Sequence, residues 1–154
     1  TYIQHGSKTK QLRQLPAESY LRPVERMEEL ILLGRQVDIA LEHGSVYAHD
    51  ISRGGVFAAL WELGDALKCG LEVCHDDIPI LQETIEICEH TGDNPYMIDG
   101  CGAALFVVPD GEHLADKLYE AGYEASVIGH LTENSDRVVV HDEERRFLTP
   151  PRYL

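Results

Sequence analysis

The stretch from Val46 to Leu67 constrains the fold most, because it combines a strand, a tight polar turn and a helix. Residues 46–51 have the character of a short buried strand, and a polar turn with two adjacent glycines follows. Apolar residues then recur at helical spacing, at Val56, Leu60, Leu63 and Leu67. We therefore predict a strand followed by a helix from about Gly54 to Leu67, which Gly70 ends.

The turn between this strand and helix is Ser52-Arg53-Gly54-Gly55. We expect the Ser52 hydroxyl to cap the helix, and we expect Arg53 and bare backbone N–H groups at Gly54 and Gly55 to favour a bound anion. Glycine suits such a site because a backbone without Cβ approaches a ligand closely. The alternative is a capped helix that packs tightly on a neighbouring strand, and both interpretations stay open here.

The rest of the chain continues the alternation of helices and strands. Pro23 opens a helix that Gly44 ends, and Asp110 caps a later helix that Gly122 ends. Strands are expected at residues 71–74, 103–108 and 124–131, a helix follows Pro79, and residues 137–140 and 146–148 form a terminal hairpin. The pattern predicts an α/β fold with α+β character, in which helices pack on one mixed, partly ferredoxin-like sheet. Residues 1–22 are polar and predict a linker or flexible N-terminal arm, and residues 23–154 form the domain.

The charge balance excludes two classes of partner. The chain has 27 acidic and 13 basic residues, a formal net charge of −14, which repels nucleic acids and anionic membranes. No apolar run approaches the roughly 18 residues of a membrane span, and the sequence does not begin with a signal-peptide pattern. We therefore expect a cytoplasmic protein.

Two groups of metal-binding residue types need separate interpretation. Zinc ligand types occur at Cys69, Cys74, His75, Cys88, His90 and Cys101. These residues contain no Cys-x-x-Cys pair and their spacing fits no common zinc module, so we expect four free thiols and no metal site. Asp76 and Asp77 could bind a cation as a carboxylate pair, or could complement the dipole of the helix that follows them. We prefer the second interpretation.

Several motifs in fixed order give the chain a family resemblance. They are the segment 48–56 with the Ala-Leu-Trp-Glu after it, the strand 70–73, Ile78-Pro79-Ile80, the glycine-rich turn before Ala103, Val107-Val108-Pro109 and Val127-Ile128-Gly129. From about Pro23 to Thr149 the chain resembles the C-terminal domain of the AIR (aminoimidazole ribonucleotide) synthase superfamily. The spacing is most similar to the hydrogenase maturation branch and its relatives.

The resemblance implies ATP-dependent activation of an amide, acyl or phosphate oxygen. In that superfamily an N-terminal domain supplies most ligands of ATP and Mg²⁺ and the main dimer interface, and no segment of this chain resembles it. ATP and Mg²⁺ are thus expected only together with such a domain, in cis or in trans, with none tightly bound to this chain, which alone would be inactive. A small molecule or a protein would be the substrate, and a homodimer is one assembly that the resemblance allows.

The resemblance also implies residue roles, each with a structural alternative. The catalytic candidates are His49 and Asp50, which would face the cleft. In the structural alternative, His49 is a core histidine with a satisfied hydrogen bond, and the Asp50 carboxylate fixes the turn by binding its backbone amides. Nucleotide or substrate phosphate would contact Ser52, Arg53, Gly54, Gly55, Gly100 and Gly102, unless these glycines merely permit the turns. The alternative function class is a stand-alone, non-catalytic ligand-binding or interaction module with the same fold.

Overall fold

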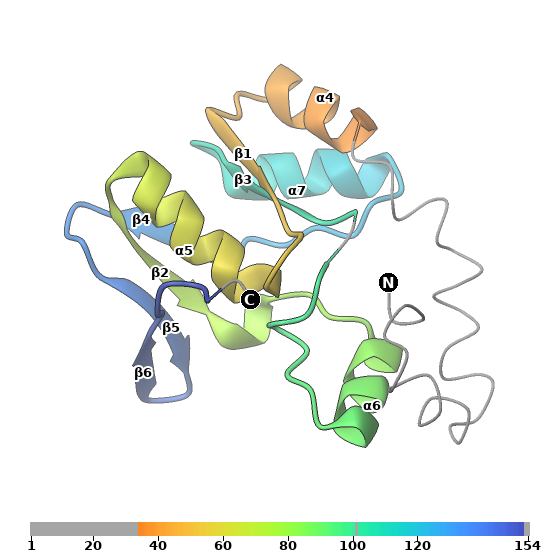
Figure 1. Cartoon of the computed structure of the whole chain (residues 1–154). Coiled ribbons are helices and arrows are strands. Elements are labelled where there is room, and N and C mark those ends of the chain that lie inside the picture. Colours follow the sequence, from red (N-terminus) through yellow and green to blue (C-terminus); the bar gives the residue numbers. More distant parts are fainter. Residues whose placement is uncertain (1–33, 101, 153–154) are drawn as a thin grey trace.

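The computed structural model of the chain describes residues 34–100 and 102–152 (Figure 1). Four α-helices and six strands alternate in this part, much as the sequence predicts. In order they are α4 (Gly34–Glu42), β1 (Tyr47–Asp50), α5 (Gly55–Leu67), β2 (Gly70–Cys74), the 3₁₀ helix η2 (His75–Asp77), α6 (Gln82–Thr91), β3 (Ala104–Val107), α7 (Gly111–Glu120), β4 (Gly129–Thr132), β5 (Arg137–His141) and β6 (Glu144–Phe147). The predicted arm at 1–22 and the start of the helix predicted from Pro23 lie outside the described residues.

The strands form two sheets. β1 pairs antiparallel with β3, and a second sheet has the order β4-β2-β5-β6. Within the second sheet β2 and β5 are parallel, whereas β2–β4 and β5–β6 are antiparallel. The predicted α/β fold with a mixed sheet is confirmed, but the expectation of one sheet was wrong. In the described part of the chain, β1 and β3 pair only with each other, and no ladder joins them to the other four strands.

Strand β3 lies between two hydrophobic cores. Its alternate residues Leu105 and Val107 pack in the larger core, which includes Val56, Leu60 and Leu63 of α5 and Leu71, Val73 and Val139 of the four-stranded sheet. Phe106 and Val108 pack in a smaller core with Ala40 of α4 and Leu114 and Leu118 of α7. Figure 1 shows α4 and α7 side by side next to the β1–β3 pair. The alternation of strand side chains thus sends one strand into both cores.

Helix ends follow the predicted glycine signals in two of three cases. Gly44 and Gly122 have φ values of 86° and 89°, and the amides after them, of Ser45 and Tyr123, donate to Ala40 and Leu118 carbonyls, which closes both helices. At α5 the left-handed residue is Lys68, with φ 54°, so the prediction that Gly70 ends this helix was wrong.

Gly70 does not end α5 but is the first residue of β2, where other chain segments pack closely against it. A Cβ at this position would lie 2.5 Å from the Asp136 carbonyl oxygen and still closer to side-chain oxygens of Thr132 and Asn134. Glycine is therefore required for close approach of two chain segments rather than for a helix end.

Three further sequence predictions concern strands, and the structure tests each of them. The predicted strand 124–131 begins only at Gly129; before it, the Ser126 hydroxyl donates to the Asp77 carbonyl oxygen (2.7 Å). The predicted hairpin is confirmed, with His141 opposite Glu144 and a turn at Asp142 and Glu143. The strand predicted to be buried, β1, alternates between half-buried and exposed residues.

Among residues 34–100 and 102–152, no helix has the length and apolar character needed to cross a bilayer.

Candidate functional site

The turn before α5 differs from the predicted capped helix. The N-cap residue is Gly54, with φ 82°, and no side chain caps the helix, so the predicted role of Ser52 was wrong. The Gly54 N–H donates to Asp99 Oδ1 (3.2 Å), and the Gly55 N–H donates to the Ser52 carbonyl oxygen (3.3 Å). The two amides are thus not bare, because two consecutive left-handed glycines turn the chain so that protein oxygens reach them.

Residues 94–99, which we name the crossing segment, pass directly over this turn. The crossing segment accepts a hydrogen bond from the Phe57 N–H at the Tyr96 carbonyl oxygen (3.3 Å), and the rings of these two residues stack with centroids 5.2 Å apart. A Cβ at Gly55 would lie 2.5 Å from the Tyr96 carbonyl oxygen and 2.7 Å from that of Ile98. Gly55 therefore permits the close approach of the crossing segment.

The second predicted glycine group lies beside the first. A Cβ at Gly100 would lie 2.8 Å from Cγ2 of Ile51, and the Ile51 N–H donates to the Ala103 carbonyl oxygen (2.9 Å). Gly102 has φ 86°, which favours glycine. The structure therefore brings Gly100 and Gly102 next to the turn at Ser52–Gly55, and whether either group contacts phosphate stays a prediction.

The two catalytic candidates lie at the end of β1. His49 Nδ1 donates to the Asp50 carbonyl oxygen (2.7 Å), and His49 Nε2 lies 3.4 Å from Oε2 of Glu62 on α5. Both ring nitrogens thus face oxygen atoms, which holds the imidazole against α5. The Asp50 carboxylate is 59% exposed and lies 3.9 Å from His49 Nδ1. The contacts of His49 are those of a well-held structural histidine, and its catalytic role stays a prediction.

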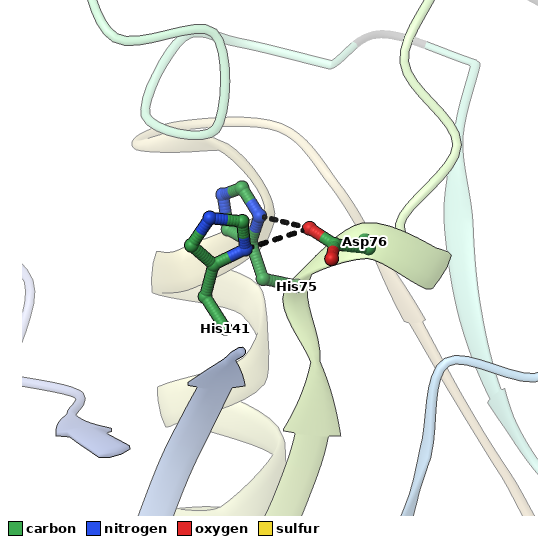
Figure 2. Close-up of side chains that lie close together, drawn as sticks. All are labelled: His75, Asp76 and His141. Atoms are coloured by element: carbon green, nitrogen blue, oxygen red, sulfur yellow. Dashed lines mark hydrogen bonds and ion pairs between the residues drawn. The ribbon is translucent and has the colours of Figure 1, made fainter. Parts of the chain in front are cut away.

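A second cluster, which the sequence analysis did not bring together, combines His75, Asp76 and His141 (Figure 2). His75 and Asp76 belong to η2 directly after β2, and His141 is the last residue of β5. Because β2 and β5 are parallel neighbours, their carboxyl ends meet at one edge of the sheet. The three side chains therefore come together although 65 residues separate Asp76 from His141.

One carboxylate oxygen holds both imidazoles of this His–Asp–His cluster. The Nδ1 atoms of His75 and His141 donate to Asp76 Oδ1 at 3.1 Å and 2.7 Å, and the two rings meet edge-on with centroids 4.7 Å apart. The hydrogen bond from His75, followed by that from His141, lowers the pKa of the Asp76 carboxyl below its ordinary value. The carboxylate form is thus favoured, with both histidines as its donors.

Tyr96 connects the two sites. Its ring centroid lies 4.4 Å from that of His75, while its backbone oxygen accepts the bond from Phe57 at the start of α5. Burial, and secondarily the charge of Asp76, raises the pKa of the Tyr96 hydroxyl. The crossing segment thus contacts the glycine turn on one side and the His–Asp–His cluster on the other.

The cluster corrects the interpretation of Asp76 as a helix-dipole residue. Helix α6 begins at Gln82, so Asp76 lies too far from its N-terminus to complement the dipole, and its partners are the two histidines. Cys69 and Cys74 are free thiols, as predicted, whereas Cys101 lies outside the described residues, so the prediction of four free thiols stays a prediction for the whole set. A sequence signal did exist, since a histidine stands at the end of each of two predicted strands, but the pairing of those strands was needed to interpret it.

Comparison with known families gives a match over most of the chain. Residues 4–142 match the family described as AIR synthase related protein, C-terminal domain. Among curated proteins, a carbamoyl dehydratase HypE from Rhodobacter capsulatus is 32% identical over 77 residues. This alignment covers 50% of the present chain and 23% of that relative, so the chain spans only about a quarter of the relative's length.

Solved structures show the same fold. The chain is similar to a HypE–HypF complex structure with a TM-score of 0.68 at 20% identity, over 77% of this chain and 41% of that one. It is also similar to the hydrogenase maturation protein HypE in complex with ATP, with a TM-score of 0.66 at 21% identity, over 79% of this chain and 41% of that one. At these identities the likeness establishes the fold.

Proposed function

Since the chain belongs to the AIR synthase related family, as a C-terminal domain of that type, we propose that it forms the substrate- and phosphate-side domain of an ATP-dependent enzyme. The reaction class is activation of an amide, acyl or phosphate oxygen by phosphoryl transfer, after which the phosphorylated oxygen becomes a better leaving group. The family match over residues 4–142 is the observation that carries this proposal. A hydrogenase maturation-like reaction is its most specific form, because the curated relative is a carbamoyl dehydratase.

The geometry of the glycine turn supports a phosphate contact. The Gly54 N–H already donates to a carboxylate oxygen of Asp99, and a phosphate oxygen is an acceptor of the same charge and type. Arg53 is exposed in the same turn and supplies the positive charge that a phosphate attracts. A phosphate would thus replace the Asp99 carboxylate at the Gly54 amide, and this exchange limits the affinity of the isolated chain.

ATP and Mg²⁺ enter this proposal through a second domain. A related protein, HypE, has been solved in complex with ATP, and another HypE structure contains HypF. We infer that an AIR synthase-like N-terminal domain, in cis or in trans, supplies the ligands of Mg²⁺ and most ligands of ATP. His49 and Asp50 remain the catalytic candidates of this chain, and Ser52, Gly55, Gly100 and Gly102 line the proposed phosphate side.

The test combines nucleotide binding with turnover. Purified chain is titrated with ATP and Mg²⁺, alone and with the N-terminal half of a HypE relative, while amide chemical shifts are recorded. We expect no ATP hydrolysis by the chain alone, and ATP-induced shifts at the amides of Ser52–Gly55, Gly100 and Gly102 when the second half is present. Arg53→Ala should weaken binding with little loss of stability, since an exposed charge contributes roughly 0–1 kcal/mol to folding, and Arg152→Ala is the matched exposed control.

Two outcomes contradict the proposal in different ways. Hydrolysis of ATP by the chain alone would show that the second half is unnecessary. Unperturbed Ser52–Gly55 amides in the presence of both ATP and the second half would leave the turn as a structural feature and favour a non-catalytic interaction module.

A further inference from the structure

We propose that His75, Asp76 and His141 form a binding site for a divalent transition metal ion, with Zn²⁺ as the ion of best fit. Each residue offers one ligand atom, and the three atoms lie within 4.8 Å of one another (Figure 2). This inference is independent of the proposed ATP-dependent function, because it uses a different group of residues and needs no nucleotide.

The distances suit a tetrahedral ion. With metal–ligand bonds of about 2.0–2.1 Å, tetrahedral zinc separates its ligand atoms by about 3.3 Å. The His75 Nδ1–Asp76 Oδ1 separation of 3.1 Å is already close to this value, and the His141 Nδ1–Asp76 Oδ1 separation is 2.7 Å. The second of these pairs has to open by about 0.6 Å. The ligand atoms of the two histidines lie within 4.8 Å of each other, so they need at most a modest approach. The cation would take the place of the two ring protons that now join the histidines to Asp76.

The donor types select the class of ion. Two imidazole nitrogens and one carboxylate oxygen suit Zn²⁺ and neighbouring first-row divalent ions, whereas Mg²⁺ and Ca²⁺ prefer oxygen ligands alone. A chain with a formal charge of −14 also attracts cations in general. Three protein ligands leave one tetrahedral position for water or a substrate atom, which is the arrangement of catalytic rather than structural zinc sites.

The surroundings hold the ligands in place. His75 directly follows β2 and His141 is the last residue of β5, and these strands are paired, rigid elements. The Tyr96 ring covers one side of His75. Asp142 Oδ2 lies 3.9 Å from Nε2 of His141, where a carboxylate can orient a ligating imidazole through its other nitrogen. The His75 side chain is 26% exposed and that of His141 is 48% exposed, so an ion can reach the site from solvent.

The test measures zinc binding to the metal-free, reduced chain by competition with a chromophoric chelator. We expect one Zn²⁺ per chain. His141→Ala and Asp76→Asn should each lower the zinc affinity by more than the roughly 10–100-fold that is lost when a group that only orients a metal ligand is removed. His130→Ala is the matched control, because His130 is also an exposed strand histidine, on β4, and should leave the affinity unchanged.

Two spectroscopic readouts separate this site from the cysteines and from a purely structural cluster. Co²⁺ bound at His75, Asp76 and His141 should show d–d absorption without thiolate charge transfer, and zinc should shift the ring resonances of His75 and His141 in the unmodified chain. A thiolate band, unshifted ring resonances, or equal affinity in His141→Ala and the unmodified chain would overturn the proposal. A loss of stability in His141→Ala without any zinc binding would do the same, since the cluster would then only tie η2 to β5.

Discussion

Replacing Gly55 by alanine tests how tightly the crossing segment packs on the start of α5. Gly55 has φ 72°, and its new Cβ would lie 2.5 Å from the Tyr96 carbonyl oxygen. The left-handed backbone alone costs an alanine roughly 1–2 kcal/mol. Relief of the clash requires movement of the crossing segment, which weakens the Phe57–Tyr96 hydrogen bond. Overpacking of this kind commonly lowers the free energy of unfolding by a further amount of about 1–3 kcal/mol.

Gly92 is a matched control for this substitution. Its φ of 73° is almost the same, but a Cβ at Gly92 would have nothing within 4 Å. The backbone strain and the change in unfolded-state entropy are therefore shared by Gly92→Ala and Gly55→Ala, and the difference between the two variants reports the clash alone.

The assay is urea unfolding followed through the fluorescence of Trp61, the one tryptophan of the chain, which lies on α5. We expect the free energy of unfolding of Gly55→Ala to be about 1–3 kcal/mol lower than that of Gly92→Ala. Equal free energies of unfolding in the two variants would refute the close approach of the crossing segment to Gly55.

Three further predictions concern single residues. Lys68→Gly should raise the free energy of unfolding by about 0.5–1 kcal/mol in chemical denaturation, because glycine adopts the left-handed conformation without strain. The exposed ion pair with Asp65 is lost, but it contributes little. A destabilised variant would contradict this prediction. Asp110→Ala should lower the free energy of unfolding by about 1 kcal/mol in the same assay, because the Asp110 carboxylate caps α7 at the His113 N–H (3.0 Å), and a loss of only a few tenths would show that the cap contributes little. Asp76→Asn should lower the pKa of Tyr96, since a nearby negative charge disfavours the phenolate, while burial keeps that pKa above its ordinary value; ultraviolet titration measures it, and an unchanged pKa would refute the electrostatic contact.

Local signals predicted much of the fold. Asp110 as a helix cap and Gly44 and Gly122 as helix ends are confirmed, because each depends on the conformational preference of one residue and its immediate neighbours. The buried face of α5 is confirmed for the same reason, since helical periodicity is a local property. The end of α5 at Lys68 was not predicted, because a lysine seldom adopts the left-handed conformation that this residue has.

The candidate sites were less predictable because they depend on distant segments. Asp99, rather than bare amides or the Ser52 hydroxyl, meets the N–H of Gly54, and no local pattern relates these residues. Asp76 was assigned to a helix dipole because His141 was not known to stand beside it until β2 and β5 were paired. Long-range contacts of this kind leave no periodicity in a single sequence.

The double-sided packing of β3 has a consequence for how this protein unfolds. Leu105 and Val107 of β3 belong to one core, and Phe106 of β3 and the adjoining Val108 belong to the other. Neither core can therefore unfold without removing packing contacts from its neighbour. The described part of the chain should therefore unfold in a single cooperative transition rather than in two steps. A one-residue deletion within β3 would exchange the two faces of the strand and damage both halves of the molecule at once.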